Sequence, residues 1–261
     1  MQPWLTGPAE ILEHALSLLA DDSDRNRRLA MIATDNAVEL AIKTYLGLPR
    51  RITGIEISRR DYQDMSESFP KLLDALERHC GDKLDGVELG EVEWYHRLRN
   101  QLYHQGNGLT IEREKVRVYA ELAKILFRNL FGTDISLPAA PREDLLGRFL
   151  SSWVSLEKTV AQITAEYRGD LAVAGGRVPP PSIAMSALHR LGVISKKDML
   201  RLDRLRALRN SVVHGEPDAE TALNKKAVAD LDSMLEVLQR VKETHNQPIE
   251  TDAKRTRGSS P

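Results

Sequence analysis

The sequence predicts an all-α protein made of two similar helical bundles. Apolar residues recur at helical spacing through most of the chain, no stretch alternates as a half-buried strand would, and one short motif occurs twice. A length of 261 residues accommodates two domains of ordinary size. We expect a first bundle at 1–131, a linker at 132–141, a second bundle at 142–246 and a disordered polar tail at 247–261.

Apolar stripes in the first bundle predict helices at residues 9–20, 24–46, 61–80, 91–104 and 112–131. Ser23 is a suitable N-cap for the second of these helices. Pro70 is expected to open the second half of the helix at 61–80, because proline fits the first turn of a helix. Residues 49–60 and 81–90 are predicted to be loops.

Three polar residues interrupt or border the apolar stripe of the helix at 24–46, namely Asp35, Asn36 and Glu39. We expect this group to form a flank turned toward water. The alternative is a set of partners for something charged.

The second bundle is predicted to contain helices at residues 143–167, 182–191, 196–214 and 219–243. Ser195 is expected to cap the helix at 196–214, which stops at Gly215. The loop at 169–181 is rich in glycine and proline, but it lacks the glycine spacing and the Lys-Ser/Thr pair of a phosphate-binding loop.

The repeated motif reads Leu-Arg-Asn-x-x-x-His, with a glycine within two residues of the histidine. Its members are Arg99, Asn100 and His104 in the first bundle, and each has a counterpart 110 positions later in Arg209, Asn210 and His214. Matching order and spacing indicate an internal duplication.

Composition excludes several classes of function. A formal net charge of -1 argues against a protein that coats nucleic acid by electrostatics alone. Cys80 is the only cysteine, which rules out an intrachain disulfide and argues strongly against a cysteine-based zinc cluster. No histidine shows metal-ligand spacing, so we expect neither a metal nor a cofactor. No signal or membrane segment is apparent, and a cytoplasmic location is expected.

The motif combines groups that suit phosphate chemistry without a metal. Asn and His four residues apart lie within about 40° on a helix, and the glycine provides an end at which the arginine can converge with them. Arginine offers a fork of donors to phosphate oxygens, and imidazole exchanges protons near neutral pH. One histidine would have to act as both base and acid, whereas two facing motifs would supply a pair.

The two Arg-Asn-x-x-x-His segments, at 99–104 and 209–214, resemble the signature of the HEPN superfamily. Many HEPN proteins are metal-independent endoribonucleases of toxin, anti-phage and RNA-processing systems, in which two motifs build one cleft. The resemblance implies that the halves pack as a pseudo-dimer and that Arg99, Asn100, His104, Arg209, Asn210 and His214 cleave RNA through 2′-hydroxyl attack. It also implies an inhibitory or activating partner protein and a homo-oligomer.

Simpler interpretations stand beside this one. The arginines would pair with a carboxylate such as Glu39 or Asp203, the histidines would cap helix ends, and the asparagines would bond to backbone. His96 is expected at the surface. The rival function is a non-catalytic HEPN-like module that binds RNA or a nucleotide or serves in assembly, and a helical scaffold with a coincidental repeat ranks last.

Overall fold

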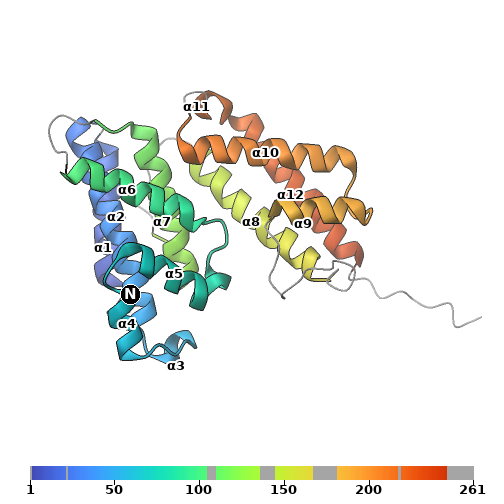
Figure 1. The fold of residues 1–261 in the computed structure, drawn as a ribbon. Coiled ribbons are helices and arrows are strands. Elements are labelled where there is room, and N and C mark those ends of the chain that lie inside the picture. Colours follow the sequence, from blue (N-terminus) through green and yellow to red (C-terminus); the bar gives the residue numbers. More distant parts are fainter. Residues whose placement is uncertain are drawn as a thin grey trace, which may run out of the picture.

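A computed structural model describes residues 2–21, 23–104, 110–135, 145–166, 181–216 and 219–245. The described residues form helices, turns and irregular segments with no strand, which confirms the all-α prediction. Figure 1 shows the helices in two groups, here called the first half (residues 2–135) and the second half (residues 145–245), with α7, α8 and α10 meeting between them.

The first half consists of α1 (Thr6–Ala20), α2 (Asp24–Gly47), α3 (Arg50–Thr53), α4 (Arg59–Met65), α5 (Phe69–Cys80), a 3-10 turn at Gly81–Lys83, α6 (Leu89–His104) and α7 (Arg113–Phe131). Helix α2 packs between α1 and α7, and α5 and α6 lie against it. Burial of apolar side chains stabilises this arrangement. The large side chains that are fully buried include Leu12, Met31, Ile42, Leu72, Leu76, Tyr119, Leu122 and Phe127.

The second half consists of α8 (Leu145–Glu166), α9 (Pro181–Arg190), α10 (Lys196–His214), α11 (Ala219–Ala222) and α12 (Lys225–His245). Helices α8 and α12 form its main packing pair, and α9 and α10 lie beside them. The core side chains come from every longer helix of this half, including Phe149, Trp153, Leu156, Leu188, Leu202, Leu231 and Met234.

Both predicted serine caps are confirmed. The Ser23 Oγ accepts a hydrogen bond from the Asn26 N–H at 3.2 Å, and the Ser195 Oγ accepts one from the Asp198 N–H at 3.1 Å. Gly215 ends α10 with a φ of 63°, a left-handed conformation that glycine adopts without strain. Gly215 therefore ends α10 directly after His214, the last residue of the second motif.

Three predicted boundaries differ from the structure. The segment predicted as one helix at 61–80 is α4 and α5, separated at 66–68. The predicted loop at 49–60 contains α3 and the first two residues of α4. The helix predicted at 219–243 is divided because the Asn224 Oδ1 accepts from the backbone of Lys226 and Ala227 and so starts α12 afresh. The tail at 247–261 and most of the linker lie outside the described residues.

Candidate functional site

The first motif is organised around the carboxylate of Asp35, which is fully buried in α2. Asp35 Oδ2 accepts a hydrogen bond from Arg99 Nε at 2.7 Å and lies 3.0 Å from His96 Nδ1. The Tyr119 hydroxyl donates to Oδ1 at 2.8 Å. A buried charge is stable only when it is paired and hydrogen-bonded, so this network holds parts of α2, α6 and α7 together and fixes both side chains of α6.

The Arg99 guanidinium is held at three of its five N–H groups. Besides the bond to Asp35, its Nη1 donates to Asn100 Oδ1 at 2.9 Å and its Nη2 donates to Asn36 Oδ1 at 3.1 Å. Glu39 Oε2 lies 3.9 Å from Arg99 Nη2, and the other oxygen of the same carboxylate pairs with Lys43. Two N–H groups remain on a side chain that is 16% exposed. The side-chain oxygens of both asparagines therefore face the guanidinium.

His104 completes the first motif as the last residue of α6. Its side chain is exposed beside the 65% exposed Tyr103, with the two ring centroids 5.4 Å apart. Asn100 precedes it by about one helical turn. Arg99, Asn100 and His104 therefore all lie within the last two turns of α6.

The second motif has a different environment. Arg209 is 2% exposed and pairs with both carboxylate oxygens of Glu91, which lies on α6 and is 4% exposed. The Nη2–Oε2 distance is 2.9 Å, Nη1 contacts Oε1, and the Nε–H has no acceptor among the described residues. Asn210 and His214 are exposed. Arg209 therefore joins the two halves and does not reach solvent.

The described contacts do not join the two motif ends. The C-terminal end of α10 lies against the N-terminal half of α6, where the Tyr95 hydroxyl donates to the Val213 carbonyl at 2.6 Å and the His214 ring centroid lies 6.2 Å from that of Trp94. His104 follows Trp94 by ten residues, about 15 Å along the helix axis. Figure 1 shows α6 running away from the second half, with its C-terminal end remote from α10.

Burial perturbs several groups at the junction between the halves. It raises the pKa of Glu91, although Arg209 acts in the opposite direction. Burial likewise raises the pKa of Glu157, a residue of α8 that accepts a hydrogen bond from Trp153 Nε1 at 2.8 Å. One guanidinium thus lies among two largely buried acids. Outside the junction, burial raises the pKa of the Cys80 thiol to about 11, so this cysteine is protonated at neutral pH and is a poor nucleophile.

Asp35, Glu39 and His96 place possible metal-ligand atoms within 4.8 Å of one another. A cation there would meet the guanidinium of Arg99, which stays charged at every physiological pH. The Asp35 oxygens are already engaged with Arg99, Tyr119 and His96. This donor set fits an arginine and does not fit a metal ion.

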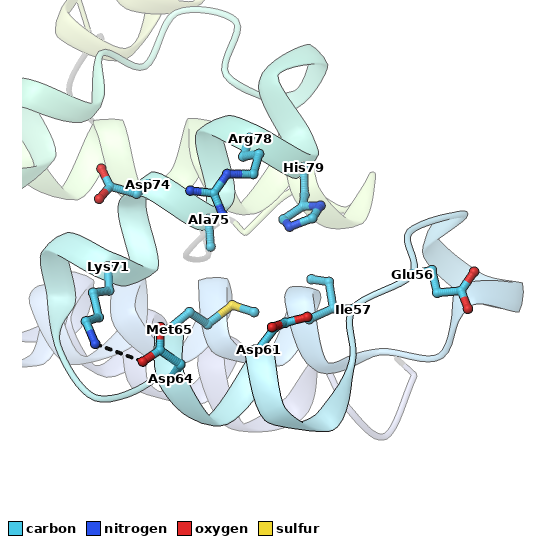
Figure 2. Close-up of a pocket in the computed structure, with 10 residues that line it drawn as sticks. All are labelled: Glu56, Ile57, Asp61, Asp64, Met65, Lys71, Asp74, Ala75, Arg78 and His79. Atoms are coloured by element: carbon cyan, nitrogen blue, oxygen red, sulfur yellow. Dashed lines mark hydrogen bonds and ion pairs between the residues drawn. The ribbon is translucent and has the colours of Figure 1, made fainter.

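A separate cavity of about 350 Å³ lies between α4 and α5. Its lining carries both signs of charge, and Figure 2 shows Asp61 and Asp64 on one wall facing Arg78 and His79 on the other. Asp64 is already paired with Lys71 at 3.0 Å. The mixed lining favours no particular class of ligand, and the cavity includes no motif residue.

No protein-family model, curated protein or solved structure matches this chain. Within the described ranges, no helix combines the length and the apolar character that crossing a membrane requires.

Sequence reasoning missed the main partners of the motif arginines. Asp35 and Asn36 were expected on a flank turned toward water. Asn36 is exposed as expected, but Asp35 is buried. Both contact Arg99, so the alternative of partners for a charged group is also observed. The expected surface position of His96 is also wrong, because its side chain is only 14% exposed. The signal for Asp35 was a carboxylate inside an otherwise apolar stripe.

Proposed function

We propose that this chain is a HEPN-like, metal-independent endoribonuclease whose first motif holds the RNA phosphate. The observation that carries the proposal is the arrangement of Arg99, fixed by Asp35 on one side and flanked by the side-chain amides of Asn36 and Asn100, whose oxygens accept from it. A guanidinium and amide N–H groups are the donors that phosphate oxygens accept. The same proposal includes a role for this chain as an effector of a toxin or anti-phage system.

Strand cleavage at this site would proceed by attack of a ribose 2′-hydroxyl on the adjacent phosphorus. Arg99, Asn100 and Asn36 bind and orient the phosphate through N–H donors, and the exposed His104 exchanges a proton with the reacting oxygens. The products are one strand with a 2′,3′-cyclic phosphate and one with a 5′-hydroxyl. The paired carboxylates near Arg99 are neutralised locally by Arg99 and Lys43, so they do not repel the phosphate strongly.

The second motif contributes differently in this proposal. Its arginine is committed to Glu91 and supports the junction between the halves, while Asn210 and His214 lie exposed beside it. A second guanidinium at the phosphate would have to come from another copy of the chain, and the exposed end of α6 with Tyr103 is the surface on which such a copy would pack.

A second candidate is a non-catalytic module that binds RNA or a nucleotide phosphate. The burial of Arg209 favours it, because one of the two guanidiniums expected to stabilise the reaction does not face solvent. This candidate predicts affinity for RNA without turnover.

The test compares Arg99→Lys with Arg97→Lys in EDTA on a labelled single-stranded RNA. Arg97 lies on the same helix with an exposed side chain and pairs only with Glu93 among the described residues, so it is a matched control. We expect Arg99→Lys to reduce cleavage about 100-fold, because lysine lacks the fork of donors, and Arg97→Lys to match the wild type. RNA binding without products with cyclic phosphate ends would favour the non-catalytic candidate.

A further inference from the structure

Strand cleavage requires two proton transfers, one from the attacking 2′-hydroxyl and one to the departing 5′-oxygen. The first motif contains one histidine, and His214 contacts Trp94, about 15 Å along α6 from His104. A nearer imidazole is available on α6 itself, because His96 lies one helical turn before Asn100.

The contacts of His96 are those of an oriented proton acceptor. Its Nδ1 lies 3.0 Å from the buried Asp35 carboxylate, and its ring stacks on Phe69 with centroids 3.9 Å apart and an interplanar angle of 11°. A carboxylate at Nδ1 places the proton of neutral imidazole on that nitrogen and leaves Nε2 as the acceptor. The His96 side chain is 14% exposed, with one ring edge at Asp35 and one ring face covered by Phe69.

His96, Asn100 and His104 form a single row along α6. Residues spaced by four lie on one ridge of a helix, about 6 Å apart along its axis. Asn100, which accepts a hydrogen bond from Arg99 Nη1, therefore lies between His96 and His104 in this row. A phosphate bound by Arg99 and Asn100 would have one histidine toward each end of the row.

We propose that His96 is the general base of the reaction and His104 the general acid, an assignment that rests on the proposed function. His96 Nε2 takes the proton of the 2′-hydroxyl, and the freed electron pair of O2′ forms a bond to phosphorus. The bond between phosphorus and O5′ breaks, its electron pair stays on O5′, and His104 delivers a proton there. The carboxylate behind His96 suits a base, as in hydrolase triads, and the position of His104 at a helix C-terminus suits a proton donor.

The test uses two RNA substrates that differ in one atom, the ordinary phosphodiester and an analogue with sulfur in place of O5′. A thiolate leaves without a proton, so the analogue needs the base and not the acid. We expect His104→Gln to slow the ordinary substrate about 100-fold or more and to leave the sulfur analogue near the wild-type rate. His96→Gln, whose amide can still donate to Asp35, is expected to slow both substrates about 100-fold.

A His96→Gln variant that cleaves both substrates within about threefold of the wild type would overturn the assignment while leaving the proposed function intact. The assignment would also be overturned, with the two roles reversed, if His96→Gln cleaved the sulfur analogue near the wild-type rate and His104→Gln did not. A wild type inactive on both substrates would instead count against the proposed function. His96→Asn, checked by helical circular dichroism, replaces His96→Gln if that variant does not fold.

Discussion

At the scale of single residues, Asp35 determines where the donors of the first motif point. One buried carboxylate receives hydrogen bonds from Arg99 and Tyr119 and faces His96 Nδ1. Loss of its charge leaves a mostly buried guanidinium whose remaining carboxylate is Glu39, 3.9 Å away and shared with Lys43. That loss is more costly than the loss of a surface pair.

We therefore expect Asp35→Asn to lower the free energy of unfolding by about 3 kcal/mol, measured by urea denaturation. Asp74→Asn is the matched control on the exposed face of α5, and its effect should stay within about 0.5 kcal/mol. Equal effects of the two substitutions would mean that the Asp35 network does not stabilise the fold.

Glu157 provides a prediction about pH. Burial raises the pKa of this carboxyl above 4.5, so between pH 4.5 and its folded pKa the folded protein binds this proton more readily than the unfolded chain does. The contribution of Glu157 to stability is therefore fully present below that window and is lost as the pH rises through the folded pKa. Glu157→Gln should therefore become progressively more favourable relative to the wild type as the pH rises above the unfolded pKa of this carboxyl.

The measurement is urea denaturation of both proteins across that pH range, with Glu236→Gln on the exposed face of α12 as the control. The control curve should run parallel to that of the wild type. If the unfolding free energies of Glu157→Gln and the wild type also ran parallel across the pH range, the Glu157 carboxyl would have the same pKa in the folded and unfolded states.

The partners of these residues could not be predicted from the sequence. Asp35 and Arg99 are 64 positions apart, and Glu91 and Arg209 are 118 positions apart. No local spacing encodes such pairs, because they depend on how α2 and α10 pack against α6. The presence of Arg99, Asn100 and His104 at one helix end could be predicted, since residues one turn apart share a helix face.

At the scale of elements, helical periodicity and caps were sufficient to locate most helices. The apolar stripes and the serines at 23 and 195 act within one or two turns, so their effects are readable locally. The break between α4 and α5 and the restart at Asn224 were not predicted. At both places the chain can either break the helix with a new cap or continue it, and the free energies of these two alternatives differ little.

Gly86 tests whether the turn before α6 is in direct contact with the second half. Its φ of 74° resembles the 76° of Gly54, but a Cβ at Gly86 would lie 2.1 Å from Val154 Cγ2, whereas nothing lies within 4 Å at Gly54. We expect Gly54→Ala to cost about 1 kcal/mol of unfolding free energy from the backbone alone. Gly86→Ala should cost about 2 kcal/mol more from overpacking.

Val154→Ala should recover part of that extra cost in the double variant, because it removes the clashing methyl group. Thermodynamic additivity of Gly86→Ala and Val154→Ala in urea denaturation would contradict the contact between the two halves.

At the scale of the whole molecule, the two copies of the motif have separate environments. The first lies at the exposed end of α6, while the arginine of the second is buried between the halves with Glu91. The duplication in sequence is therefore accompanied by a division of roles in the proposed function, with phosphate chemistry assigned to the first motif and cohesion of the halves to the second.

The most direct measurement is the initial rate of RNA cleavage in EDTA by His104→Ala and His214→Ala, both exposed at helix C-termini and both checked for retained helicity. We predict that His104→Ala lowers the rate about 100-fold or more, whereas His214→Ala keeps it within about threefold of the wild type. Loss of cleavage in His214→Ala equal to that in His104→Ala would contradict the assignment of the reaction to the first motif.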